Sequence, residues 1–512
     1  MSEGSKTAKI DELRGLRERL KGEESEVRRQ HERGKLTARE RIDRLLDPGS
    51  FVELDPFVEH RFTEFGMDRR RSMGDGVVTG HGTIGGRPVF VFSQDFMFMG
   101  GSTGEVHTWK IARVLRLAAE NGMPVIGFHD SGGARIQEGV ASLMGLGDIF
   151  RGNVACSGVV PQIAVIAGPT AGGAAYSPAL MDFIFMVRGI SYLFITGPVV
   201  VREITGEEIS FEGLGGADVH SAVSGVATVA VDSEDECFDE IRRLLSYLPS
   251  NNLEDPPAAD PASPRGVDIG EVLPDDLRRG YDIHLALDGI LDAGSLFELQ
   301  PGFAPNVVVG FARMEGRTVG VVASQPNVMA GTMTVDSSDK VARFVRFCDA
   351  FNIPIVTLQD VPGYLPGVDQ EHGGIIRHGA KVLYAYAEAT APKVTVILRK
   401  SYGGAFIALG SKHIGGDAVF ALPTAEIAVL GPEAAVEIIF RRDLQEDPGK
   451  RDELIDRYRG QFANPYQAAR YGYIDDVIEP SEVRPRIIDT LNLLANKRVR
   501  HHPPKRHGNM PV

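Results

Sequence analysis

Apolar residues follow two alternating patterns between residues 88 and 176. Short continuous apolar runs predict buried strands at 89–93, 124–129 and 162–167. Between them, apolar residues recur with helical spacing, which predicts helices over 105–121 and from about Leu143. Strands that alternate with helices are typical of α/β folds with a mostly parallel sheet. We therefore expect a functional site at the edge where the carboxyl ends of these strands meet.

The same pattern returns between residues 318 and 406. Four landmarks repeat in order: Gln94 and Gln325 (325 − 94 = 231), Lys110 and Lys340 (340 − 110 = 230), Asp130 and Asp360 (360 − 130 = 230), and Gly172 and Gly403 (403 − 172 = 231). Matches in one order at nearly one offset indicate an internal duplication. We predict an N-terminal domain over residues 1–255 and a C-terminal domain over 276–512. The stretch 256–275 between them is biased to Pro, Ala and Asp, which is typical of a linker.

Residues 7–47 carry many charges, and their apolar residues recur with helical spacing. This pattern predicts an amphipathic helical arm that packs on the body of the protein or on a partner subunit. A minor alternative is that its Lys and Arg residues help to hold phosphate groups.

Composition limits the classes of function. A chain of 512 residues is too long for one core, and its net charge of 55 − 69 = −14 argues against nucleic acid as a partner. Three separated cysteines allow neither a disulfide framework nor a four-cysteine zinc site, and we expect no metal. The first residues lack the apolar core of a signal peptide. The longest apolar runs are too short to cross a bilayer. We expect a cytoplasmic protein without membrane association.

Two Gly-Gly-Ala turns are the main candidates for chemistry. Gly172-Gly173-Ala174 follows the strand predicted at 163–167, and Gly403-Gly404-Ala405 follows the strand predicted at 394–398. Glycines that open a helix at a strand end leave backbone N–H groups accessible to a ligand, and two such groups form an oxyanion hole. Tight packing of helix on strand is the alternative for a single turn. The occurrence of the turn in both copies favours two oxyanion holes.

Two other glycine motifs match the signatures of dinucleotide-binding proteins and of serine hydrolases. Residues 80–85 match the dinucleotide fingerprint, but another strand follows instead of the required helix, so we interpret them as a hairpin turn. Residues 100–104 match the G-x-S-x-G motif of serine hydrolases. The corresponding Ala330-Gly331-Thr332 has no serine, and no His–Asp pair can be assigned. We therefore expect Ser102 to cap or turn the chain.

Longer stretches carry a resemblance to a known family. They include Lys35-Leu-Thr-Ala-Arg-Glu-Arg-Ile42, Asp130-Ser-Gly-Gly-Ala-Arg-Ile-Gln-Glu-Gly139, Phe194-Ile-Thr-Gly-Pro198 and Gly373-Gly-Ile-Ile-Arg-His-Gly-Ala-Lys381. From about residue 10 to its end, the chain closely resembles the carboxyltransferase (β) subunit of biotin-dependent acyl-CoA carboxylases, of the propionyl-CoA carboxylase and methylmalonyl-CoA transcarboxylase type. The resemblance implies two crotonase-like (ClpP/crotonase superhelix) domains and a homo-hexamer of paired trimers.

The resemblance also implies the substrates and partners. The N-terminal half of one subunit would hold acyl-CoA, and the C-terminal half of its dimer partner would hold biotin. The chain contains no Met-Lys-Met biotinylation sequence and no ATP-binding biotin carboxylase region. Biotin would therefore be covalently bound to a partner, the biotin carboxylase and biotin carrier (α) subunit. Because decarboxylated biotin itself would remove the α-proton, the family needs no general base from the protein.

Site residues follow from the same resemblance. The N–H groups of Gly172 and Gly173 would bind the thioester enolate, with Gly132, Gly133 and Ala134 as further substrate-binding residues. Those of Gly404 and Ala405, with Gly403 in the cofactor-binding turn, would bind the ureido oxyanion of biotin. Phe406 and Ile407 would contact the acyl group. Propionyl-specific members often have Asp at the position of Ile407, and an apolar residue resembles members with a broader or different acyl preference.

Three alternatives stay open from the sequence. The first is a decarboxylase or transcarboxylase subunit that runs the same chemistry in reverse. The second is a biotin-independent crotonase-like hydratase or hydrolase, which would need a catalytic carboxylate near Gly172 and Gly173. The third is a non-catalytic scaffold, although glycines intact in both copies count against it.

Overall fold

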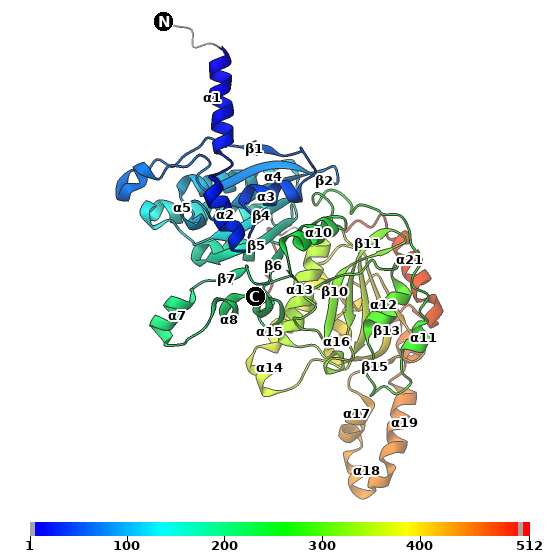
Figure 1. Cartoon of the computed structure of the whole chain (residues 1–512). Coiled ribbons are helices and arrows are strands. Elements are labelled where there is room, and N and C mark those ends of the chain that lie inside the picture. Colours follow the sequence, from blue (N-terminus) through cyan, green and yellow to red (C-terminus); the bar gives the residue numbers. More distant parts are fainter. Residues whose placement is uncertain (1–5, 500–504, 512) are drawn as a thin grey trace. The chain divides into compact units, whose positions relative to one another are not determined.

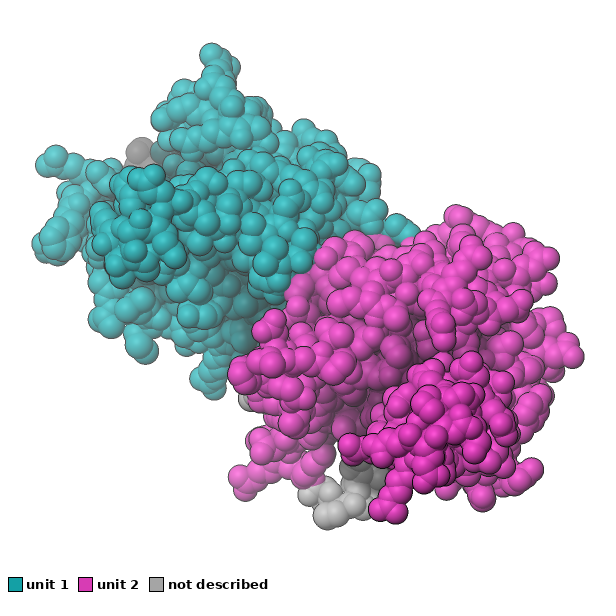
Figure 2. Space-filling view, turned by 90° about the horizontal axis from the view of Figure 1, so that it is seen from below, with its two compact units in different colours: residues 1–254 teal, residues 255–512 magenta. Residues whose placement is uncertain are grey.

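The structure is a computed structural model that describes residues 6–499 and 505–511. The chain divides into two compact units, unit 1 up to Glu254 and unit 2 from Asp255 (Figure 2). Among the described residues, no helix is long and apolar enough to cross a membrane.

Unit 1 is built on an eight-stranded sheet in the order β1-β2-β3-β4-β5-β6-β8, with β7 paired to β5. Its first pairs, β1–β2 and β2–β3, are antiparallel, and every pair from β3 onwards is parallel. The strands are β1 (Val52–Leu54), β2 (Val77–Ile84), β3 (Arg87–Gln94), β4 (Val125–Ser131), β5 (Gln162–Ala171), β6 (Phe183–Val187), β7 (Tyr192–Phe194) and β8 (Val229–Val231). The prediction of an α/β fold with a mostly parallel sheet is confirmed.

Helices cover both faces of this sheet (Figure 1). On one face, α4 and α5 bury residues such as Ile111 and Leu146 against Phe92 and Ile166. Because side chains alternate along a strand, Phe128 faces the other way and packs on Phe238 of α10. The helices of unit 1 are α1 (Lys6–Arg19), α2 (Glu24–Glu32), α3 (Ala38–Leu45), α4 (Glu105–Asn121), α5 (Val140–Cys156), α6 (Tyr176–Leu180), α7 (Pro198–Thr205), α8 (Phe211–Gly215), α9 (Ala217–Ala222) and α10 (Glu234–Leu245).

The amphipathic segment 7–47 forms α1, α2 and α3. No residue of α1 is buried, whereas α3 buries Ala38, Arg41, Ile42 and Leu45. A capping box starts α3, in which Thr37 accepts from the Glu40 backbone N–H and the Glu40 side chain accepts from the Thr37 N–H. Helix α3 is therefore an integral part of unit 1.

The glycine motif at 80–85 lies mainly within a strand. Gly80 and Gly82 belong to β2, and the chain reverses after it at Gly85 and Gly86, whose φ angles are 56° and 76°. A Cβ on Gly80 would lie 2.3 Å from the Val52 carbonyl oxygen, so glycine is needed there for the close approach of β1. The interpretation as a hairpin was right, but only the end of the motif makes the turn.

Unit 2 repeats the architecture with the order β16-β14-β13-β12-β11-β10-β9 and with β15 paired to β13. Its strands are β9 (Phe297–Leu299), β10 (Val307–Met314), β11 (Arg317–Ser324), β12 (Ile355–Val361), β13 (Lys393–Tyr402), β14 (Ala418–Ala421), β15 (Glu426–Ala428) and β16 (Asp476–Val477). Reversing this order gives the path of unit 1 strand for strand, so the internal duplication is confirmed.

The helices of unit 2 are α11 (Ile269–Val272), α12 (Ile283–Ile290), α13 (Val335–Ala350), α14 (Val368–His372), α15 (Ile375–Glu388), α16 (Gly403–Ala408), α17 (Pro432–Ile439), α18 (Arg441–Glu446), α19 (Arg451–Gln461), α20 (Pro465–Arg470) and α21 (Val483–Leu493). Helices α17, α18 and α19 project away from the sheet (Figure 1). Gly403 and Gly404 open α16 directly after β13.

The stretch 256–275, expected as a linker, contains α11 and packs on unit 2. Ile269 and Leu273 are buried in the core of that unit. The backbone N–H of Ala259 donates to the Gly316 carbonyl oxygen. The part before α11 and residues 273–275 after it lack regular structure, while Ile269 and Leu273 are drawn into the core.

Candidate active site

Each unit has a sharp strand-to-helix turn at the carboxyl end of a central strand. Gly172 follows β5 with a φ of 63°, and Gly403 follows β13 with a φ of 59°. Glycine reaches this left-handed conformation without the steric cost that other residues incur. The first N–H groups of the helices that follow have no partner within the helix, so those that find no other partner in the protein are available to a ligand.

The backbone N–H of Gly172 is not available, which differs from its expected role. It donates to the Ile195 carbonyl oxygen at 3.1 Å and so extends the pairing of β5 with the chain after β7. The next two N–H groups belong to Gly173 and Ala174. These residues correspond to Gly404 and Ala405, because 404 − 173 = 231 and 405 − 174 = 231. Gly173 and Ala174 thus stand at the same positions in unit 1 as Gly404 and Ala405 in unit 2, and Gly172 and Gly403 bend the chain.

The loop after β4 lies against the turn of unit 1. A Cβ on Gly133 would lie 3.0 Å from the Ala171 carbonyl oxygen, and the φ of Gly133 is 98°. The N–H of Gly132 donates to the Gly100 carbonyl oxygen at 2.9 Å, and that of Gly133 donates to Ser131 Oγ at 3.1 Å. The N–H of Ala134 makes no hydrogen bond with any residue that the structure describes. Of the three predicted residues, Ala134 is therefore the one whose N–H could serve a ligand.

In unit 2 the corresponding loop brings Tyr364 to the turn. The nearest atom to a Cβ built on Gly404, outside its chain neighbours, is Tyr364 Cε2 at 3.8 Å. Burial raises the pKa of Tyr364 to about 12, so its hydroxyl stays neutral. The ring is a flat apolar surface beside Gly404. No repeat in the sequence pointed to it, because Ala134 takes the same place in unit 1.

The two residues after Ala405 differ in exposure. Ile407 is 43% exposed, whereas Phe406 packs against a small core cluster that includes Ile397 and Val419. Ile407 can therefore touch a ligand, and Phe406 acts mainly as a packing residue.

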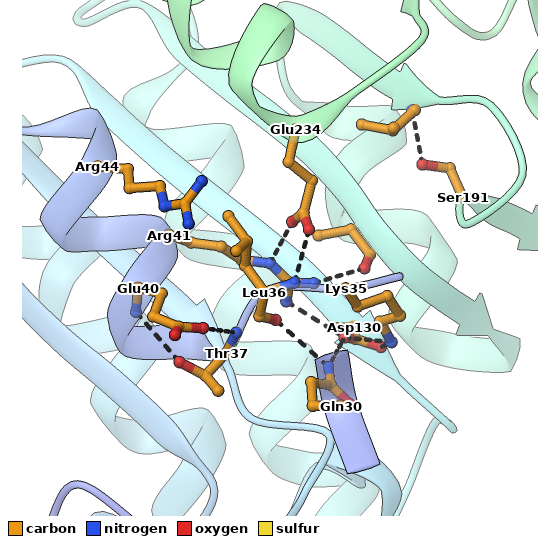
Figure 3. A network of polar contacts seen from close by, with 12 residues as sticks. Gln30, Lys35, Leu36, Thr37, Glu40, Arg41, Arg44, Asp130, Ser191 and Glu234 are labelled. Carbon is orange, nitrogen blue, oxygen red and sulfur yellow. Dashed lines mark hydrogen bonds and ion pairs between the residues drawn. The ribbon is translucent and has the colours of Figure 1, made fainter. Parts of the chain in front are cut away.

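A buried ionic cluster surrounds Asp130, near the end of β4 and just before the loop of unit 1 (Figure 3). We call its four residues, Lys35, Arg41, Asp130 and Glu234, the Asp130 clamp. Lys35 Nζ donates to Asp130 Oδ1 at 2.7 Å, and Arg41 Nη1 donates to Asp130 Oδ2 at 3.2 Å. Arg41 Nε donates to Glu234 Oε1 at 2.6 Å. Burial is the largest influence on Lys35 and lowers its pKa. The sequence motifs contain Lys35, Arg41 and Asp130, but sequence reasoning did not bring these residues together.

Unit 2 holds the corresponding Asp360 with a different cation. Arg399 Nε donates to Asp360 Oδ2 at 2.7 Å, and the guanidinium carbon lies 4.7 Å from the centre of the Tyr281 ring. Arg399 belongs to β13, and its counterpart in β5 is Gly168, because 399 − 168 = 231.

Side chains for other chemistries are already engaged. Ser102 Oγ accepts a hydrogen bond from Arg135 Nε at 3.4 Å, and Arg135 is ion-paired with Asp75 and Glu138, both at 2.7 Å. Ser102 therefore belongs to a structural network, as expected. Asp130 has a side chain that is 0% exposed and is paired with two cations, so it is not available as the base of a hydratase. Within residues 6–499 and 505–511, no group of His, Cys, Asp and Glu residues could hold a metal ion.

Comparison with known proteins agrees with this picture. The sequence model described as the carboxyl transferase domain matches residues 29–510. The chain is 57% identical over 512 residues to a propionyl-CoA carboxylase carboxyltransferase subunit of Haloferax mediterranei, covering 98% of this chain and 99% of the relative. It is 53% identical to the methylmalonyl-CoA decarboxylase subunit alpha of Veillonella parvula, covering 96% of each.

A solved structure is similar over the whole chain. The hexameric transcarboxylase 12S core with methylmalonyl-coenzyme A and methylmalonic acid bound matches with a TM-score of 0.97 and 48% identity, covering 100% of this chain and 99% of that one.

Proposed function

The chain belongs to the carboxyl transferase domain family, and on this premise we propose that it is the carboxyltransferase subunit of a biotin-dependent acyl-CoA carboxylase. It moves a carboxyl group from carboxybiotin on a separate carrier to the α-carbon of a short acyl-CoA. The observation that carries the proposal is the pair of equivalent turns, one in each unit, at the carboxyl ends of β5 and β13. Two substrates that each develop a negative oxygen need two sets of preorganised N–H donors.

The turn of unit 2 is the half-site that we assign to biotin. Gly404 is exposed, and a Cβ built on it would be in van der Waals contact with Tyr364 Cε2 at 3.8 Å, so the Tyr364 ring forms an apolar wall beside the turn. Biotin, when bound, supplies the carboxyl group and afterwards the base for the α-proton. Gly404 and Ala405 would donate their N–H groups to its ureido oxygen, Gly403 bends the chain, and the Tyr364 ring would line one side of the site beside exposed Gly404.

The turn of unit 1 fits the thioester. Gly173 and Ala174 donate N–H groups towards the thioester oxygen, on which charge develops when the α-proton leaves. Gly172 shapes this turn, and the loop from Gly132 to Ala134 forms the adjoining wall. No side chain of the protein needs to exchange a proton, so rate enhancement comes from positioning and from fixed N–H dipoles.

The acyl group is a short one of the propionyl type, giving a product like methylmalonyl-CoA. The names of the relatives and the ligand of the transcarboxylase structure support this substrate class. Exposed Ile407 contacts the acyl group and tunes its preferred length. The hexameric assembly of the transcarboxylase 12S core supports a homo-hexamer. A biotin carboxylase and biotin carrier (α) subunit is the partner, and the cytoplasm is the compartment.

A second candidate is the same chemistry in reverse, in a decarboxylase. The identity of 53% to the methylmalonyl-CoA decarboxylase subunit alpha of Veillonella parvula supports this second candidate. Both directions use the same turns, and the partner subunits set the direction.

The experiment is biotin-dependent decarboxylation by the purified chain. Malonyl-, methylmalonyl- and ethylmalonyl-CoA are each incubated with and without free biotin, and loss of the carboxyl group is followed. Loss that requires biotin is expected, with methylmalonyl-CoA preferred. Loss without biotin would contradict the proposal and favour a biotin-independent enzyme, and no loss with any ester would favour a scaffold.

A further inference from the structure

Arg41 joins four elements through one planar group. It is carried by α3, and its Nη1 donates to Asp130 at the end of β4. Its Nη2 donates to the Ala167 carbonyl oxygen of β5 at 2.8 Å, and its Nε donates to Glu234, the first residue of α10. The loop with Ala134 follows β4, and the turn with Gly173 follows β5. One guanidinium therefore fixes the relative position of the two strand ends that carry the proposed acyl-side donors.

The buried charges of the Asp130 clamp favour a single arrangement of its four side chains. Its two cations balance its two carboxylates, and the exposed side-chain fractions are 6% for Lys35, 0% for Arg41 and Asp130, and 8% for Glu234. Charges so well buried lose much of their stabilisation when they move away from their partners. The planar guanidinium of an arginine donates hydrogen bonds in three fixed directions at once, whereas the ammonium group of a lysine is a point charge without this planar geometry.

Unit 2 reaches the same result with one residue of its own sheet. Arg399 binds Asp360 and also donates to the carbonyl oxygens of Pro274 and Arg279, at 3.2 and 3.0 Å. In unit 1 this route is closed, because even a Cβ on Gly168 would lie 2.0 Å from Asp130 Oδ1. The two units thus hold the same carboxylate at the same strand end with cations from different elements. The shared feature is the fixed strand end, not the packing around it.

From this geometry we propose that the Asp130 clamp positions the acyl-side turn and that Arg399 positions the biotin-side turn. Arg41 and Arg399 are positioning residues that touch neither substrate and act on separate half-sites. The inference rests on the proposed function, because it assigns the turn of unit 1 to the acyl-CoA and the turn of unit 2 to biotin.

The test compares Arg41→Lys with Arg399→Lys in the full chain. Controls are Arg39→Lys, on α3 but paired with Glu53 outside the clamp, and Arg346→Lys, paired with Glu388 in unit 2. The KM values for methylmalonyl-CoA and for free biotin are measured in biotin-dependent decarboxylation. Calorimetry without biotin gives the Kd for methylmalonyl-CoA.

We expect a crossed result. Arg41→Lys raises the KM and the Kd for the CoA ester about tenfold and leaves the KM for biotin unchanged, because a small displacement of donors is costly. Arg399→Lys raises the KM for biotin about tenfold and leaves the Kd for the CoA ester unchanged. Both controls resemble the wild type.

Equal effects of the two variants on both substrates, or no effect, would overturn the inference. If Arg41→Lys does not fold, Glu234→Gln removes one charge of the clamp, and the same selective rise for the CoA ester is expected. If the wild type decarboxylates no ester, the proposed function fails. The calorimetric Kd of Arg41→Lys against Arg39→Lys then still decides whether the clamp positions a CoA-ester site.

Discussion

The two units present equivalent turns but secure them with different charges. Asp130 in unit 1 is held by Lys35 and Arg41, which precede the sheet in sequence, whereas Asp360 in unit 2 is held by Arg399 of the sheet itself. Where unit 2 has this arginine, unit 1 has Gly168, and the missing side chain makes room for the cations of the helical arm.

A second pair of positions shows the same kind of exchange. Arg39 of α3 binds Glu53 with two contacts of 2.9 Å, and His284 of α12 binds Glu298 at 2.9 Å. The positions correspond, because 284 − 39 = 245 and 298 − 53 = 245. A permanently charged side chain in unit 1 is thus replaced by a titratable one in unit 2. The comparison teaches that the strand ends and their carboxylates are common to the two halves, while the cations that hold them are not.

The largest expected effect comes from filling the turns themselves. Gly404→Val and Gly173→Val should each lower carboxyl transfer by more than about 10²–10³-fold. The side chain introduced at Gly404 enters the exposed space beside the turn, whereas a Cβ on Gly173 would lie 2.8 Å from Leu146 Cδ1 and so displace the turn that carries the donors. The measurement is the rate of biotin-dependent decarboxylation. Gly460→Val, on α19 where a Cβ meets nothing within 4 Å, is the control. Retained turnover in either turn variant would break the equivalence of the two turns.

Removing Arg399 from unit 2 or Arg41 from unit 1 should lower the stability of the protein by different amounts. Arg399→Ala leaves Asp360 without its cation and should cost about 3–5 kcal/mol, as expected for a broken buried ion pair. Arg41→Ala should cost less, because Lys35 still binds Asp130 at 2.7 Å. Denaturant unfolding gives both values, with Arg346→Ala as the control at an exposed pair. A larger loss of unfolding free energy for Arg41→Ala would show that its ion pair with Glu234 contributes more to stability than its ion pair with Asp130.

Exchange of Ile407 should change which acyl group is used. Ile407→Asp places a carboxylate at an exposed position of α16 and should lower the use of ethylmalonyl-CoA relative to methylmalonyl-CoA about tenfold, since a methylene in an apolar contact changes discrimination on that scale. The ratio of the two kcat/KM values is the measurement, and Ile438→Asp on α17 is the control. An unchanged ratio would remove Ile407 from the acyl site.

The smallest effect concerns pH. The hydrogen bond to Glu298 is the largest influence on His284 and raises its pKa to about 9. Because the folded pKa lies above the ordinary value of 6.5, the stabilisation is complete below about pH 6.5 and is lost as pH rises through about 9. The side chain is 38% exposed, so solvent screening limits the loss to about 1 kcal/mol.

His284→Arg tests this dependence by giving unit 2 the cation of unit 1. The unfolding midpoints of wild type and variant are compared from about pH 6 to pH 10, so that other titrating groups cancel in the difference. We expect the variant to gain stability relative to the wild type as pH rises. Parallel curves would show that the pair contributes nothing.

The sequence by itself determined the architecture. Hydrophobic spacing located α4, β3 and β4 to within a few residues, and the offset of 230 or 231 revealed the duplication. These features are local or repeated, so they can be recognised without distances. The Gly-Gly-Ala turns were found for the same reason, because glycines after a strand are a local signal for a special backbone conformation.

Tertiary structure alone decided which groups in the site are available. It paired the N–H of Gly172 with Ile195, which leaves Gly173 and Ala174 as the proposed donors, and it partly buried Phe406 while exposing Ile407. It also joined Arg41 to Asp130 across 89 residues and to Glu234 across 193. Spacing along a chain gives no measure of such contacts, because the pairing of strands and the desolvation of charges depend on neighbours that are distant in sequence.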